Sequence, residues 1–179
     1  MVAVDLLPGI DISITVAGQA LTEHEDHDEE QQDRTTARYV EAISGQIFEV
    51  RITAQKGFRS GGDALSFRIH VDGSKAINIP VLQNSACRFE NYVHVSQGSQ
   101  QNASEVRRYC FATLETSSDG RAFAGDAAKL KDLGSIEVTV HQVQVTGVCE
   151  LSTVAKDLSS VGVVSEKAFK GKAISHSVK

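Results

Sequence analysis

The residues with the clearest chemical potential lie in one short run, residues 22–33, with the sequence TEHEDHDEEQQD. We call this run the acidic segment. It holds seven carboxylates and no lysine or arginine: Glu23, Glu25, Asp26, Asp28, Glu29, Glu30 and Asp33. Because these seven charges lie together, removing them would change the formal net charge of the chain from −5 to +2. Such a run is typical of a solvated loop, and it can also attract a basic partner electrostatically.

The acidic segment also contains His24 and His27, three residues apart. On one face of a helix, two imidazoles and a neighbouring carboxylate could bind a divalent ion. Two known metal motifs do not match, because the run reads HEDH instead of HExxH and lacks the glycine of an EF-hand loop. His24 and His27 are therefore weak candidates for metal ligands, because neither motif supports them. We predict no cofactor.

A second charged run closes the chain as SEKAFKGKAISHSVK. It carries Lys167, Lys170, Lys172 and Lys179 against a single acid, Glu166. This pattern is typical of a docked or frayed terminus, and it could also provide a basic contact for an acidic partner. A few lysines without a wider basic surface bind nucleic acid only weakly, so nucleic acid is not expected as a partner. The lysines and the acidic segment could also contact each other, within one chain or between chains.

Motifs for catalysis are absent from the sequence. It contains no GxSxG elbow, no P-loop and no GxGxxG after a strand. His70 and His94 occupy polar positions of expected strands, which predicts a solvated face. A nucleophilic pair such as Cys87 with His94 could form only through folding, which the sequence does not show. We therefore expect no enzyme, and a hydrolytic or metal-dependent enzyme using His24 and His27 stays as an alternative.

The elements that must position these residues are strands, because apolar and polar residues alternate along most of the chain. Alternation is clearest in residues 10–16, 48–54 and 65–71, and a one-residue bulge near His141 would keep 136–145 on one face. Alternation also predicts strands at 89–95, with Phe89, Val93 and Val95 on one face, and at 109–113. The tight turn Asp72–Gly73 is expected to lead into a strand through Ile77 and Ile79. Residues 36–42 are expected to form a short strand that makes a hairpin with 46–54. A long polar hairpin loop is expected at 96–105, and short helices are expected near 127–133 and 165–170.

About eight strands, each with one solvated face, predict an all-β antiparallel sandwich, with a barrel as the alternative. We place the sandwich and the acidic segment in residues 1–146 and a docked or partly flexible tail in 147–179. Cys87, Cys110 and Cys149 form no CxxC pair, and the first residues lack the basic region of a secretory signal. We therefore expect reduced thiols in the cytoplasm or nucleus, and no membrane association, because no apolar run is long enough to span.

Several blocks resemble a known family of uncharacterised fungal proteins built on one domain of unknown function. The similar blocks are LPGIDISITVAGQAL, RYVEAISGQIFEVRI, GDALSFRIHVDG, LGSIEVTVHQVQV and SEKAFKGKAISHSVK, which together span nearly the whole chain in the same order. The resemblance implies a single β-rich, intracellular domain without a known activity or cofactor. It carries over no functional residues, and the acidic segment is denser here than the family pattern suggests.

These observations lead to one main hypothesis and two alternatives. The main hypothesis is a non-catalytic protein-interaction module that uses the acidic segment and the closing lysines. The first alternative is a self-assembling, nucleoplasmin-like sandwich that binds histones, which is an analogy at the level of fold. The second is the enzyme described above.

Overall fold

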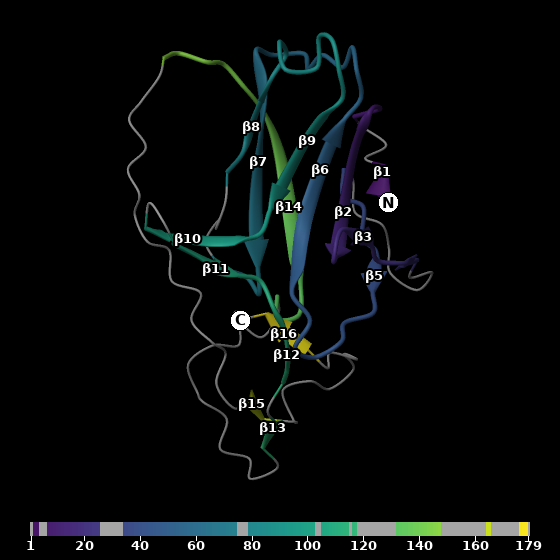
Figure 1. Cartoon of the computed structure of the whole chain (residues 1–179), viewed down its shortest axis with the longest axis vertical. Helices are drawn as coiled ribbons and strands as arrows, with labels where there is room; N and C mark the ends of the chain where they lie inside the picture. The colour runs from purple at the N-terminus through teal and green to yellow at the C-terminus, as the bar shows by residue number, and fades with distance from the viewer. Residues whose placement is uncertain are drawn as a thin grey trace.

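The computed structural model describes residues 2–3, 7–25, 34–74, 79–102, 105–114, 116–117, 132–147, 164–165 and 176–178. These residues form strands and connecting turns and no helix (Figure 1). The longer strands are β2 (Ile10–Val16), β6 (Phe48–Ala54), β7 (Ala64–Val71), β9 (Tyr92–Ser96), β10 (Gly98–Asn102) and β14 (Ile136–Val143). The shorter ones are β1 (Val2–Ala3), β3 (Gln19–Ala20), β4 (Glu23–His24), β5 (Tyr39–Val40), β8 (Val81–Gln83), β11 (Glu105–Arg108), β12 (Phe111–Thr113), β13 (Thr116–Ser117), β15 (Val164–Ser165) and β16 (His176–Val178).

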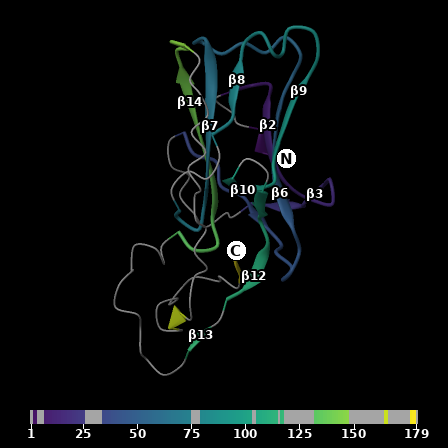
Figure 2. The same cartoon turned by 60° about the vertical axis from the view of Figure 1, so that its left-hand side comes forward.

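Two antiparallel sheets form the body of the molecule. The first runs β1-β2-β6-β9, with β3 paired to β2, and the second runs β14-β7-β8. In Figure 2 the second sheet lies on one side and β2, β6 and β9 lie on the other, so the two sheets face each other as layers. The predicted all-β antiparallel sandwich is therefore confirmed.

The core lies between these layers and is built from the inward residues of β6 and β7. Phe48, Val50 and Ile52 of β6 are fully buried, and Leu65 and Ile69 of β7 face them from the other sheet. Burying each such side chain contributes about 1.5–3 kcal/mol to stability. The period-two alternation of these two strands, which the sequence predicts, is therefore what holds the layers together.

An aromatic stack closes the core at the end where β6 begins. The ring of Phe48 lies 5.3 Å from that of Tyr109 and 4.4 Å from that of Phe111. The phenol of Tyr109 contacts the Ser96 hydroxyl at 3.1 Å. Burial raises the pKa of Tyr109, so the phenol remains protonated and can serve as a donor in this buried pair.

The outer face of the first sheet differs from the expected solvated face. Ile12 and Ile14 of β2 share the core face but are only partly buried, whereas Ser13 and Thr15 on the opposite face are almost fully buried. In the neighbouring β6, Arg51 lies opposite Ser13 and Glu49 lies opposite Thr15, whose hydroxyl is 3.5 Å from the Glu49 carboxylate. Alternation therefore predicted the faces correctly but not their burial.

The predicted faces of β9 are wrong. Val93 and Val95 point outward with 47% and 38% of their surface exposed, and His94 points inward. The reason is the register, because β9 pairs with β6 so that His94 lies opposite the core residue Ile52. A one-residue shift exchanges the two faces of a strand, and here the long-range pairing decides against the local pattern.

Three further predictions are wrong, because the strands pair differently from what the local sequence pattern indicates. Residues 36–42 make no hairpin with β6, since only Tyr39–Val40 is a strand and it pairs with β4. The bulge near His141 is absent, because β14 pairs with β7 one-to-one along all eight residues. In the region expected as a long loop, 96–105, residues 98–102 form β10 and pair with β11 at 105–108. Both expected helices lie outside the described residues, apart from the turn at 132–133 and Ser165.

The tight turn at Asp72–Gly73 is confirmed, with φ angles of 49° and 65° and a hydrogen bond from the Ser74 amide to the Val71 carbonyl at 2.9 Å. The strand after it, β8, begins only at Val81, while the expected strand position Ile77 lies outside the described residues. No stretch within the described part of the chain forms a helix long and apolar enough to cross a membrane.

Candidate functional site

The first residues of the acidic segment form a short antiparallel pair with residues 39–40, which follow the segment in the chain. In this pair, Glu23 of β4 lies opposite Val40 of β5, and His24 lies opposite Tyr39. Just beyond it, the Arg38 guanidinium and the Glu25 carboxylate form an ion pair at 3.0 Å. An exposed pair of this kind contributes about 0–1 kcal/mol, so the backbone ladder is the more important restraint. The segment therefore leaves and re-enters the sandwich through a defined stem.

The structure places some of the predicted site residues and leaves others undescribed. Glu23 is half-buried in the stem, and His24 and Glu25 are exposed there. The remaining candidates lie outside the described residues: Asp26, His27, Asp28, Glu29, Glu30, Lys167, Lys170 and Lys172. In the part of the chain that is described, no three His, Cys, Asp or Glu side chains gather where they could hold a metal ion.

A hollow of about 350 Å³ opens where β2 ends and β6 begins. We call it the Glu49 hollow. It is lined by residues from three separate parts of the chain: Val16, Ala17, Gly45, Gln46, Ile47, Glu49 and Arg108. Glu49 alternates with the fully buried Phe48 and Val50, so it points away from the core. The sequence contains no local signal for this site, because its walls meet only when distant strands pair.

The Glu49 carboxylate is positioned by two neutral groups. Its Oε1 accepts a hydrogen bond from Gln97 Nε2 at 2.9 Å, and its Oε2 lies 3.5 Å from the hydroxyl of the buried Thr15, which donates to it. Among the described residues, no cation forms an ion pair with Glu49, and Arg108 lines the hollow without pairing to it. The arrangement is a fixed carboxylate with unused acceptor capacity at the surface.

The chain connects the acidic segment to the walls of this hollow on both sides. β4 begins six residues after Ala17, and Gly45 follows five residues after the end of β5. A chain spans at most about 3.5 Å per residue, so the stem lies within about 20 Å of the hollow. In Figure 1, β3 and β5 accordingly lie beside the end of β2. Stem and hollow thus share one end of the sandwich.

The closing strand β16 docks at the same end. Residues 44–46 pair with β12 through the Gly45 amide to the Phe111 carbonyl at 2.8 Å and the Phe111 amide to the Gln46 carbonyl at 3.0 Å. The other edge of β12 pairs with β16, with Thr113 opposite His176. Lys167, Lys170 and Lys172 lie in sequence between β15 and β16, and both of these strands are paired to the fold.

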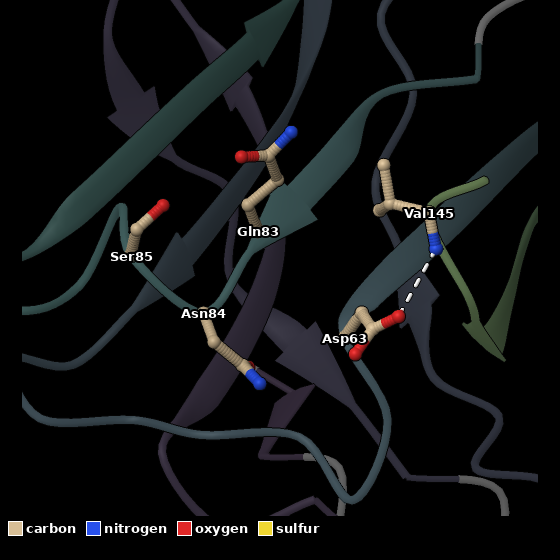
Figure 3. A pocket seen from close by; sticks show the side chains of 5 residues that line it. All are labelled: Asp63, Gln83, Asn84, Ser85 and Val145. Carbon is tan, nitrogen blue, oxygen red and sulfur yellow. Dashed lines mark hydrogen bonds between the residues drawn. The ribbon is translucent and has the colours of Figure 1, made fainter. Parts of the chain in front are cut away.

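A second, smaller hollow of about 190 Å³ lies near the start of β7 (Figure 3). It is lined by Asp63, Gln83, Asn84, Ser85 and Val145. Asp63 Oδ2 accepts a hydrogen bond from the Val145 amide at 3.2 Å. The Asn84 side chain holds the loop that precedes β7. It accepts a hydrogen bond from the Ser60 amide at 2.9 Å and donates one to the Gly62 carbonyl at 2.8 Å. The polar groups here are therefore occupied in fastening loops.

The histidine and thiol that could have formed a nucleophilic pair do not interact. Burial lowers the pKa of His94, whose Nε2 is buried and has no hydrogen-bond partner among the described residues. Burial raises the pKa of the Cys87 thiol, which disfavours the reactive thiolate. No hydrogen bond or electrostatic contact joins these two described side chains. Cys87 and Cys110 are free thiols, and Cys149 lies outside the described residues.

The fold and the site together define a class: an antiparallel β-sandwich with a charged hollow and an acidic stem at one end. The chain belongs to a family defined by a domain of unknown function, DUF7918, which matches residues 9–179. This confirms the expected membership of a family built on one domain of unknown function. The matched range includes both the acidic segment and the closing lysines. No curated protein and no solved structure matches the chain.

Proposed function

We propose that this protein is a non-catalytic interaction module that captures a basic protein partner through the acidic segment. One observation carries the proposal: the densest charge in the chain is attached to the sandwich by a paired stem, β4–β5, instead of by an extended terminus. The stem holds Glu23, the first of the seven carboxylates, in a backbone pair with Val40, and it holds Glu25 next to Arg38. A fungal, intracellular setting, in the cytoplasm or nucleus, is part of this proposal.

The physical basis is long-range attraction followed by short-range contact. Clustered charges of one sign raise the local concentration of an oppositely charged partner and increase the association rate. At physiological salt this attraction falls off over about 8 Å, so the acidic segment acts on a partner only near its own end of the sandwich. The closing lysines would contribute a contact to acidic groups of the same partner.

The experiment is capture on immobilised oligolysine at low and moderate salt. The variant Glu29→Gln/Glu30→Gln removes two charges from the acidic segment, and Glu90→Gln/Glu137→Gln removes two from exposed positions elsewhere. We expect the first variant to lose a large share of capture and the second to bind like the wild type. Equal capture by both variants would contradict the proposal, because net charge alone would then explain the binding.

Self-assembly is a second candidate, favoured by one observation. The outward valines of β9, Val93 and Val95, lie exposed at the edge of the first sheet among the described strands. A second copy pairing there would give an oligomer, and a nucleoplasmin-like closed ring that binds histones is the specific form of this alternative.

A further inference from the structure

The Glu49 hollow has the features of a receptor for one charged side chain. It combines a carboxylate fixed by Gln97 and Thr15 with an aliphatic wall from Val16, Ala17 and Ile47. We propose that this hollow binds a single lysine or arginine side chain of the basic partner, and that Glu49 recognises its cation. This inference rests on the proposed function, because that function supplies the basic partner.

The carboxylate of Glu49 favours a cation as the ligand. A carboxylate has about four acceptor positions, and Glu49 uses two of them for neutral donors. Its negative charge is not balanced by any ion pair within the described residues. A bound ammonium or guanidinium would complete the hydrogen bonding and balance the charge.

The shape and lining of the hollow favour a long side chain over a small ion. Lysine and arginine place their methylene stems on apolar surface while the charged head reaches a polar group. Ile47, which is 43% exposed, and Ala17 offer such a surface next to the Glu49 carboxylate. Isolated metal ions would need several ligating groups, which the described residues do not bring together.

Arg108 also lines the hollow, and it distinguishes a cationic ligand from an anionic one. Arg108 is exposed, so solvent screens its charge, while Glu49 is half-buried and held by two hydrogen bonds. Arg108 therefore repels a bound cation weakly and limits the affinity of the hollow. A ligand that is recognised by its carboxylate would instead depend on Arg108.

The first experiment probes the hollow alone, with n-butylammonium and n-butylguanidinium ions titrated into the full chain and followed by NMR. We expect amide signals of Ala17, Ile47 and Glu49 to shift with saturation, and the shifts to be lost in Glu49→Gln. Glutamine keeps an acceptor for Gln97 and a partner for Thr15, so the fold is retained. The control Glu90→Gln should shift like the wild type. Shifts that are absent, or equal in Glu49→Gln, would overturn the inference.

The second experiment separates this inference from the proposed function, using a labelled oligolysine peptide and fluorescence anisotropy. We expect Glu49→Gln to raise Kd by about five- to tenfold through faster dissociation, with an unchanged salt dependence. Glu29→Gln/Glu30→Gln should instead reduce the salt dependence and slow association. We expect Arg108→Gln to bind more tightly. If only the acidic-segment variant changes binding, the proposed function stands and the hollow inference falls. A loss of affinity in Arg108→Gln would also overturn it.

Discussion

At the scale of single residues, folding decides which polar side chains are buried and which stay in solvent. His94 shows this most clearly, because the sequence places it on a polar position while the register of β9 turns it toward the core. Its Nε2 is buried without a partner among the described residues, which disfavours the protonated ring. The local pattern of β9 contains no signal for this, since only the pairing with β6 fixes the face.

His94 leads to a prediction about pH. Burial lowers the pKa of His94, so the neutral ring is favoured in the folded state. This contribution to stability is present above the unfolded pKa of about 6.5 and is lost as the pH falls through the lower folded pKa. We expect His94→Leu to retain more of its stability than the wild type between pH 7.5 and 5. Urea unfolding at several pH values checks this, and parallel curves would contradict it.

Ala17 leads to a prediction about backbone strain. It adopts a φ of 50° and Gly18 a φ of 79° in the turn that joins β2 to β3. Alanine is disfavoured in this left-handed region, whereas asparagine is favoured at the first central position of a type I′ turn. We expect Ala17→Asn to increase the free energy of unfolding by about 0.5–1 kcal/mol. Thermal unfolding would show it as a higher Tm, and a lower Tm would contradict the interpretation.

At the scale of elements, the alternation of apolar and polar residues predicts a strand well when that strand lies between two others in a sheet. β6 and β7 were predicted with the correct inward residues, because both lie inside sheets and bury one full face. The short strand at 39–40 was predicted but its partner β4 was not, and the β10–β11 pair was predicted as a polar loop, because short polar strands show no alternation to detect. The Glu49 hollow was missed for the same reason, since residues 16, 49 and 108 meet only through the sheet.

The hairpin β10–β11 leads to a prediction about close backbone approach. Gly98 lies opposite Arg108, and a Cβ atom on it would overlap the backbone carbonyl of Arg107. We expect Gly98→Ala to destabilise the protein by about 2 kcal/mol or more, because backbone cannot move aside as a flexible side chain can.

Gly147 provides the matched control for this change, since a Cβ atom there meets nothing within 4 Å. Chemical denaturation of both variants makes the comparison. Equal stability of Gly98→Ala and Gly147→Ala would show that the hairpin can open at no cost, contrary to this account.

At the scale of the whole molecule, the strands that border the two charged runs, β4–β5 and β16, are connected to the walls of the Glu49 hollow. The acidic stem continues from the β2–β3 hairpin, and β16 docks on β12, which pairs with residues 44–46 at the wall of the hollow. The sequence predicted the separation of charge along the chain. It could not predict that the stem and the closing strand would flank one hollow, because strand order is set by long-range pairing.

The native mass tests whether the molecule acts alone. One chain has a mass of 19.3 kDa, which is the native mass expected for an interaction module that acts as a monomer. Light scattering coupled to gel filtration measures the mass, and we expect the monomer value. A multiple of that mass that persists at moderate salt would contradict this expectation and favour the closed assembly.

The most direct test of the central claim is the salt dependence of partner capture. The dissociation constant of a labelled oligolysine peptide, measured by anisotropy over a range of salt concentrations, isolates the contribution of the acidic segment. The account predicts a steep rise of Kd with salt in the wild type and in Glu90→Gln/Glu137→Gln, and a shallower rise in Glu29→Gln/Glu30→Gln. The same slope in all three proteins would contradict the claim that the acidic segment captures the partner.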